Sequence, residues 1–401
     1  MSSLTATTQT PASESGISRG MTLLLAAACG LGAANLYYAQ PLIGPIGDSL
    51  GLSPAARGLI VTLTQIGYGL GLLLIVPLAD LFENRRLIVT LLGLAALALT
   101  AAALSTSAPF LLAAALCIGL ASVAVQIIVP FASHFAPAAI RGQVVGNVMS
   151  GLMFGIMLAR PVSSAVAGLA SWHLIFYLSA VGMVALALVL WRALPQRRPH
   201  SQLGYVGLLA SMRRLALTTP VLQRRALYQA AMFGAFSLFW TTVPLYLAGP
   251  AFRLSQGGIA LFALAGVAGA VAAPIAGRIA DRGWGRPATA LAMLSVILAF
   301  AMSHVAAEGT TLALALLVAA AILLDFGVTA NLTVGQRVLF ALGSEYRSRL
   351  NGLYMATFFG GGAIASALGG WAYAQGGWLY ASALGALMPA AALAYFATER
   401  R

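Results

Sequence analysis

The chain has 401 residues, of which 60% are hydrophobic and 8% are charged, and its mean hydropathy is +0.92. Soluble domains are about half apolar and about a quarter charged, so this composition excludes a water-soluble globular protein. The net charge of +13 is accompanied by no basic nucleic-acid-binding module, so nucleic acid is not an expected partner. Apolar runs of about 20 residues, long enough to cross a bilayer, recur along the whole sequence. The sequence therefore predicts an all-α polytopic membrane protein.

The N-terminal residues 1–20 are polar and rich in Ser and Thr, and they predict a disordered cytoplasmic segment. They do not resemble a signal peptide, because Arg19 is their only basic residue and the following apolar run is too long. Cys29 and Cys117 both lie inside apolar runs, so neither a disulfide framework nor a metal site is expected.

Charged residues and Gly or Pro separate twelve apolar segments in the remaining chain. The predicted membrane spans are 21–43, 57–79, 87–106, 110–134, 143–168, 173–194, 223–248, 257–280, 287–305, 310–334, 348–370 and 378–397.

The basic residues, all of them arginines, predict the orientation of these spans. If both termini lie in the cytoplasm, every arginine except Arg57, Arg160 and Arg253 falls on a cytoplasmic segment. Arg57 and Arg253 then lie outside and Arg160 lies within the membrane, which agrees with the positive-inside rule. The positive net charge is thereby explained by topology and by contact with anionic lipid headgroups.

A basic cytoplasmic linker, residues 195–222, divides the chain into two sets of six spans. Its middle, Tyr205 to Leu217, is compatible with an amphipathic helix lying on the membrane surface. The predicted organisation is a bundle over 21–194, a second bundle over 223–397, and a cytoplasmic tail over 398–401.

A short charged cluster occurs at the same place in each half. "PLADLFENRR" joins the second and third spans, and "GRIADRGWGR" joins the eighth and ninth. Asp80 and Arg85 recur 201 residues later as Asp281 and Arg286, so the chain shows an internal duplication, which is common in secondary transporters.

These clusters resemble the signature of the major facilitator superfamily, in which a Gly is followed after three residues by Asp-Arg and a Gly-Arg-Arg-like ending. The second copy matches at Gly277, Asp281, Arg282, Gly285 and Arg286. The first copy keeps Asp80, Arg85 and Arg86, but has Val76 for the leading Gly and Leu81 for the first Arg. The resemblance covers about residues 20–398 and implies twelve transmembrane helices in two pseudo-symmetric six-helix bundles. Within the family, "NLYYAQPLIGPIG" and "GIMLARPVSS" look most like drug:proton antiporters.

The resemblance also implies a function for the charged clusters, because in the family their contacts hold the outward-open state. Their carboxylates can accept hydrogen bonds from the N-terminus of a neighbouring helix. Their arginines can bond to acids and carbonyls across the seam between the bundles and to lipid phosphates. The predicted conformational latch consists of Asp80, Arg85, Arg86, Asp281, Arg282, Gly285 and Arg286. The alternative is that both clusters only anchor the topology.

In the family, helices 1, 4, 7 and 10 line a central cavity, and here each of these carries polar or aromatic residues at helical spacing. The predicted substrate-binding residues are Asn35, Tyr38, Gln126, Arg160, Phe233, Phe236, Trp240, Asp325 and Thr329. Other members of these stripes are Tyr37, Gln40, Ser122, Ser133, Gln229, Ser237, Thr333 and Gln336. The alternative for any one stripe is helix–helix contact.

Two charges are predicted to lie inside the membrane, where each costs roughly 2.5–3.5 kcal/mol on insertion scales, so function is the default expectation. Asp325 is the predicted proton-coupling residue, and a permanent ion pair is its alternative. Arg160 either faces an anion or forms half of a buried pair. Direct pairing with Asp325 stays open, because the expected helix register places Asp325 several ångströms deeper.

Other features of the spans bear on this assignment. Gly151 and Gly155, four residues apart in the fifth span, predict close contact with another helix. Segment 1 carries no acid, and Ala115 stands where many proton-coupled members have an arginine. Both departures weaken the inference to proton coupling and to cationic drug substrates.

No Ser/His/Asp or Cys/His grouping supports catalysis, and the four histidines lack metal-ligand spacing, so neither an enzyme nor a metal or organic cofactor is expected. The sequence predicts a monomeric secondary transporter of a bacterial inner membrane, energised by the proton gradient. The leading interpretation is proton-coupled efflux of small amphipathic organic compounds. The alternative is uptake or facilitated transport of a sugar or an organic anion bound through Arg160, and a membrane-embedded enzyme or receptor is a remote third.

Overall fold

The structure, a computed structural model, describes residues 17–137, 140–199, 203–271, 275–276, 278, 282, 284–343 and 346–399. Helices make up the regular structure of this part of the chain, in agreement with the predicted all-α class. The elements of the first half are α1 (Arg19–Ala34), η1 (Gln40–Leu42), α2 (Ile43–Ser49), η2 (Pro54–Ala56), α3 (Leu59–Leu74), η3 (Val76–Asp80), α4 (Asn84–Ala103), α5 (Ala108–Ser122), α6 (Ala124–Phe135), α7 (Arg141–Leu169) and α8 (Trp172–Ala193).

Helix α9 (Tyr205–Thr218) occupies the linker stretch in which a helix is expected. The second half then comprises α10 (Pro220–Ala248), α11 (Gln256–Ala263), η4 (Leu264–Val271), α13 (Gly285–Met302), α14 (Thr311–Phe340) and α15 (Arg347–Ala397). Non-helical dihedrals at Gly376 and Gly377 divide α15 into two helices, and Gly377 has a φ of 62°, which a residue with a side chain rarely adopts.

Nine helices of the described chain are long and apolar enough to cross a membrane, and α15 is one of them. The kink in α15 makes it two crossings, and the shorter apolar helices α1 and α11 stand at the first and eighth predicted spans. Together these helices account for the twelve predicted spans.

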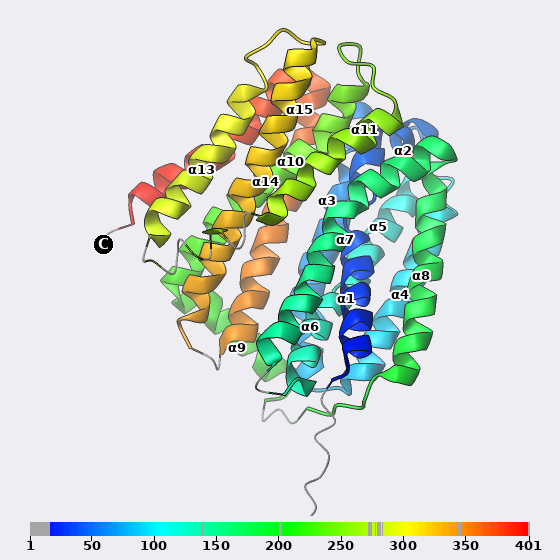
Figure 1. Ribbon diagram of the computed structural model, residues 1–401, viewed down its shortest axis with the longest axis vertical. Coiled ribbons are helices and arrows are strands. Elements are labelled where there is room, and N and C mark those ends of the chain that lie inside the picture. The colour runs from blue at the N-terminus through cyan, green and yellow to red at the C-terminus, as the bar shows by residue number, and fades with distance from the viewer. Residues whose placement is uncertain are drawn as a thin grey trace, which may run out of the picture.

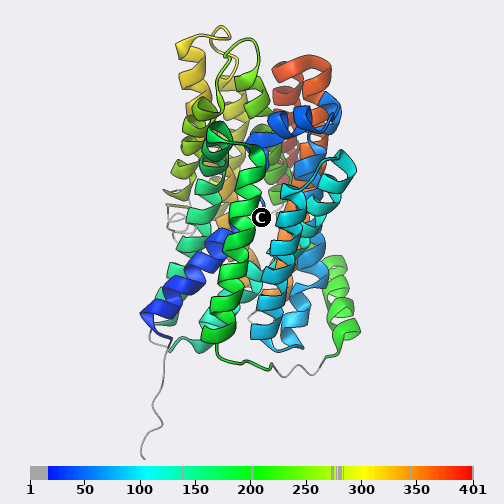
Figure 2. The same ribbon diagram turned by 90° about the vertical axis from the view of Figure 1, so that its right-hand side faces the viewer.

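The two halves of the chain pack beside each other, with α1 and α3–α8 on one side and α10, α13 and α14 on the other (Figure 1), and Figure 2 shows the molecule from the side of the first half. Helices α2 and α11 mark one end of the molecule, and α9 marks the opposite end (Figure 1). We call these ends the α2 face and the α9 face.

Close helix contact through small residues determines the packing of α1 on α7. A Cβ atom built on Gly155 would lie 2.1 Å from the Gly30 carbonyl oxygen, and one on Gly30 would lie 2.6 Å from the Gly151 carbonyl oxygen. Neither backbone can withdraw by that much, so only glycine fits at these positions. The predicted role of Gly151 and Gly155 in helix contact is therefore confirmed.

Hydrogen bonds between the two halves gather toward the α2 face. The Thr62 and Ser366 hydroxyl oxygens are 2.8 Å apart and join α3 to α15. The Ser164 hydroxyl donates to the Gln256 carbonyl at 2.8 Å and joins α7 to the start of α11. Both contacts are short and at least partly buried, so this face is closed.

Candidate functional site

Arg160 lies on α7, faces α10 of the other half and is 2% exposed. Its Nε–H donates to Gln40 Oε1 at 2.7 Å. Its guanidinium carbon lies 4.3 Å from the ring centroid of Trp240, 4.8 Å from that of Phe236 and 5.2 Å from that of Tyr37. Aromatic faces attract a cation electrostatically, so three rings stabilise this buried charge.

The local sequence explains how these groups reach Arg160. Pro41 is the second residue of η1, where its fixed φ suits the turn and its missing N–H needs no partner, and this turn places Gln40 beside α7. Phe236 and Trp240 are four residues apart on α10 and therefore share one face of that helix.

Asp325 lies on α14, is 5% exposed, and accepts a hydrogen bond from Trp240 Nε1 at 2.9 Å. A Cβ atom built on Gly266 would lie 3.0 Å from Asp325 Oδ2 and 3.4 Å from Arg160 Nη1, so both charged groups border the same small gap. The ion pairs among the described residues join other partners, and Arg160 and Asp325 form none. The structure thus answers the open question of their pairing: they are neighbours without a direct salt bridge.

Two buried donors of this site have no hydrogen-bond partner among the described residues. They are Arg160 Nη2 and Gln40 Nε2, and Gln40 is fully buried. Buried polar groups in native proteins are nearly always satisfied, so an unsatisfied pair calls for an explanation such as an absent ligand.

A narrow gap without room for a water molecule adjoins Arg160 and Trp240 on the side of the α2 face. Its other lining residues are apolar or proline: Pro41, Val243, Pro244, Ile259, Phe262 and Ala263. On this side the site is therefore walled off by hydrophobic packing.

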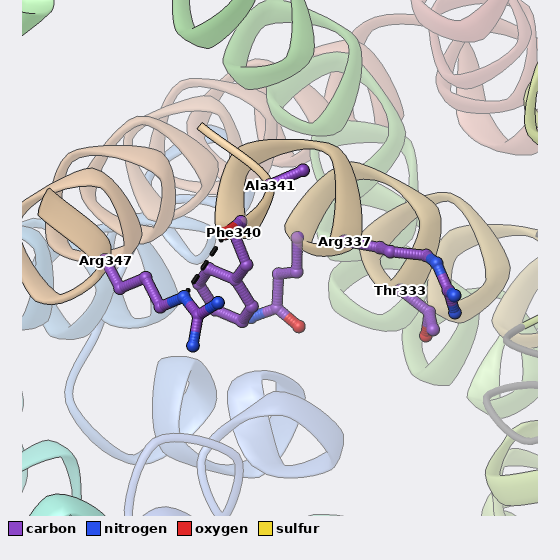
Figure 3. Close-up of a pocket in the computed structure, with 6 residues that line it drawn as sticks. Thr333, Arg337, Phe340, Ala341 and Arg347 are labelled. Atoms are coloured by element: carbon purple, nitrogen blue, oxygen red, sulfur yellow. Dashed lines mark hydrogen bonds between the residues drawn. The ribbon is translucent and has the colours of Figure 1, made fainter. Parts of the chain in front are cut away.

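On the side of the α9 face, polar residues of α14 lead from Asp325 to an open cavity of about 470 Å³. Thr329 is half-buried, and its carbonyl accepts from the Thr333 hydroxyl at 2.9 Å. Figure 3 shows the cavity, which is lined by Thr333, Gln336, Arg337, Phe340, Ala341 and Arg347. The polar residues at helical spacing on α14 thus extend from the buried carboxyl group of Asp325 to the cavity at the α9 face.

An aromatic layer joins the halves on the same side of Arg160. Phe233 stacks on Phe358 at 3.7 Å and on Phe236 at 5.1 Å. Tyr68 packs on Phe359 at 4.5 Å and accepts a hydrogen bond from Gln126 Nε2 at 2.9 Å. The contact of Tyr68 with Phe359 thus joins the bundles, while Gln126 supports it from the first half and Phe233 packs on Phe359 from the second.

The structure does not bring Asn35 and Tyr38 to Arg160. Asn35 accepts from the Ser179 hydroxyl at 2.6 Å, and Tyr38 also hydrogen-bonds Ser179, which lies on α8. Both side chains join helices inside the first half, while their neighbours Tyr37 and Gln40 face Arg160. Asn35 and Tyr38 are thus separated from Arg160 because the chain leaves the α-helical register after Ala34, and their contact with substrate stays a prediction.

Comparison with known proteins agrees with this architecture. The sequence model of the Major Facilitator Superfamily matches residues 22–318 and 261–401. The chain belongs to the major facilitator superfamily. It is 39% identical to YgaY, an uncharacterized transporter of Escherichia coli O157:H7. The match extends over 363 residues, which are 89% of this chain and 91% of YgaY. It is 34% identical to the probable transporter SCO4007 of Streptomyces coelicolor, over 92% of this chain and 87% of that protein.

The crystal structure of the nucleoside transporter NupG superposes with a TM-score of 0.75 at 14% identity, over 94% of this chain and 99% of NupG. That likeness shows the fold alone. This major facilitator protein is therefore a twelve-helix membrane transporter and not an enzyme.

The predicted latch residues of this major facilitator protein have different partners from those expected. Arg85 Nη1 donates to the Leu194 carbonyl at 3.3 Å, and Arg286 Nη2 donates to the Glu399 carbonyl at 2.9 Å. Both bonds remain within one half of the chain, so in this conformation these two bonds do not cross the seam, and the latch of the outward-open state stays a prediction. Arg86 lies 3.9 Å from Glu83, again within one half.

Among the latch residues that the structure describes, Asp80 feels a charge from the opposite half. It is exposed at the end of η3, and the charge of Arg349 on α15 acts on it together with that of Arg197. Arg282 is exposed, and Gly285 begins α13. Gly277 and Asp281 lie outside the described residues.

Sequence reasoning did not select three residues of the site as binding residues: Tyr37, Gln40 and Gly266. Tyr37 and Gln40 stand in the exporter-like stretch "NLYYAQP", but periodicity there favours Tyr38. Gly266 lies in an apolar run that carries no polar signal at all.

Proposed function

We propose that this transporter couples the movement of a small organic compound to that of protons, with Asp325 as the proton-binding group. The observation that carries the proposal is the position of this carboxyl group. It is buried beside Arg160 without an ion pair, at the inner end of a polar stripe that reaches an open cavity. A carboxyl group with such access can gain and lose a proton at one face and then, after alternation, at the other.

The aromatic layer supports an amphipathic organic substrate. Phe233, Phe236 and Trp240 form an apolar wall near Arg160 and Asp325, and pockets for organic ligands combine such walls with a few polar groups. Efflux in exchange for protons, by a drug:proton antiporter-like mechanism, is the first candidate, and it has the exporter-like motifs in its favour.

Uptake of an organic anion is the second candidate. A specific observation favours it: Arg160 Nη2 and Gln40 Nε2 are buried donors without partners. The sugar version of this alternative has no comparable support.

We place the protein as a monomer in the bacterial inner membrane, with the α9 face and both termini in the cytoplasm. The basic linker around α9 and the arginines at the start of α4 and α13 support this orientation. The cavity of Figure 3 would then open to the cytoplasm.

The test is a compound screen in proteoliposomes that enclose a pH-sensitive dye, under an imposed pH gradient of either sign. Compounds that move protons in the wild-type protein should fail to do so with Asp325→Asn, although they still bind. Asp48→Asn is the matched control, because Asp48 is exposed at the α2 face and pairs with Arg57. Unchanged proton movement in Asp325→Asn would remove this residue from the mechanism.

A further inference from the structure

The unsatisfied donors beside Arg160 specify one chemical group of the substrate. We infer that the substrate carries a carboxylate, which binds Arg160 Nη2 and Gln40 Nε2, and that it binds together with a proton on Asp325 rather than in exchange for one. The inference rests on the proposed function in that Asp325 is taken as the proton-binding group. Binding together with a proton would make the protein a symporter, whereas binding in exchange for one would make it an antiporter.

The donors select an anionic acceptor. Arg160 already uses its Nε–H on Gln40 Oε1, which holds the Gln40 amide so that its own Nε2 stays beside the guanidinium. An arginine presents its N–H groups in a planar fork that matches the two oxygens of a carboxylate. A neutral carbonyl would satisfy one donor but, with Asp325 protonated, would leave the buried positive charge without a counterion.

The aromatic faces argue against an organic cation. Trp240, Phe236 and Tyr37 would make a suitable cage for an ammonium group, but the Arg160 guanidinium lies over all three rings. A second cation would meet a like charge and find these faces occupied. The rings that could bind a substrate cation are therefore already occupied by the guanidinium of Arg160.

The gap beside Arg160 bears on the apolar part of the substrate. The gap has no room for a water molecule, so it must widen before a substrate can enter. Its lining of proline, valine, isoleucine and phenylalanine favours an apolar body. A carboxylic acid with a single ring or a short chain matches this lining.

The position of Asp325 determines the sign of the coupling. An ionised Asp325 repels a carboxylate bound at Arg160 across the gap beside Gly266, and a protonated Asp325 does not. The groups that face Asp325 from the packed elements are Arg160 on α7, Tyr37 in the turn after α1, Trp240 on α10 and Gly266 in η4. Of these, only Arg160 and Tyr37 can carry a charge.

By reciprocity, a bound carboxylate then favours the protonated form of Asp325 as much as the proton favours the carboxylate. Proton and substrate occupy the site together and cross in the same direction. An antiporter requires the opposite, namely that each displaces the other.

The experiment measures equilibrium binding to the purified full chain in lipid nanodiscs, without any gradient. The probes are benzoate, hexanoate and 3-phenylpropionate, each with its amide and its amine of the same skeleton. The carboxylates stay ionised between about pH 6 and about pH 8, because carboxyl groups in water titrate near pH 4. At least one carboxylate should bind more tightly than its amide and amine, and roughly 10- to 100-fold more tightly at pH 6 than at pH 8.

The variants separate the parts of the inference. Gln40→Leu and Arg160→Gln should weaken carboxylate binding at least tenfold, and Gln223→Leu, an exposed glutamine near α9, should leave it unchanged. Asp325→Asn should retain the tight binding at both pH values. If no carboxylate binds more tightly than its amide, the carboxylate assignment is overturned, and an affinity that is equal or higher at pH 8 overturns the joint binding with a proton.

The two proposals fail differently. Carboxylate binding without proton movement in the dye-loaded proteoliposomes would remove the proton-coupled function and leave the anion site. Proton movement driven only by amines or amides would preserve proton coupling and remove the carboxylate.

Discussion

Arg85 and Arg286 make the same pair of contacts at the end of their own halves of the chain. Each donates to a main-chain carbonyl after the last helix of its half, at Leu194 and Glu399, and each lies 5.2 Å from an aromatic ring centroid. The rings belong to Trp191 for Arg85 and to Phe396 for Arg286. The 201-residue repeat of the sequence is thus reproduced in three dimensions as a brace between the third and sixth helices of each half.

This equivalence predicts similar losses of stability in the two halves. Arg85→Leu and Arg286→Leu should each lower the free energy of unfolding by about 1–2 kcal/mol, since each removes one hydrogen bond and one cation–π contact. Thermal unfolding of the detergent-solubilised protein measures the effect. Arg213→Leu, an exposed position on α9, is the control and should change little. A latch across the seam would instead predict a change in the balance between conformations without a loss of stability.

The contact between α1 and α7 predicts a large effect of a single methyl group. Gly155→Ala should destabilise the protein by about 1–3 kcal/mol, because the added Cβ would overlap the backbone at Gly30. Gly146→Ala is a matched control on the same helix, since a Cβ there meets no atom within 4 Å. Alanine forms helix better than glycine by about 1 kcal/mol, so the control should be neutral or stabilising. Equal thermal stability of the two variants would contradict the assigned packing.

The closed α2 face predicts that transport stops when that face is locked. Thr62 and Ser366 have hydroxyl oxygens 2.8 Å apart, so cysteines at both positions are close enough to form a disulfide. The double variant Thr62→Cys, Ser366→Cys should lose flux under oxidising conditions and regain it on reduction. Native Cys117, which is exposed, should be replaced by Ser first. Flux that continues at full rate in the cross-linked protein would show that this face need not open.

Much of the fold could be read from the sequence because the membrane imposes simple rules. Apolar runs must be helical to satisfy their backbone in lipid, and arginines mark the ends of the spans. Repeated residues such as Asp80 and Asp281 then show the duplication. Two intramembrane charges, Arg160 and Asp325, also stand out by themselves, since their cost in lipid needs a reason.

The sequence by itself therefore determined the class of protein, its twelve spans and the two charged residues at its centre, because hydropathy and charge act locally along each helix. Only the tertiary structure decided that Gln40 and Tyr37, rather than Asn35 and Tyr38, reach Arg160, because the chain leaves the helical register after Ala34. It also decided that Arg160 and Asp325 are neighbours without an ion pair. That relationship depends on the depth and rotation of α7 and α14 against η4, which are set by contacts between helices far apart in the chain.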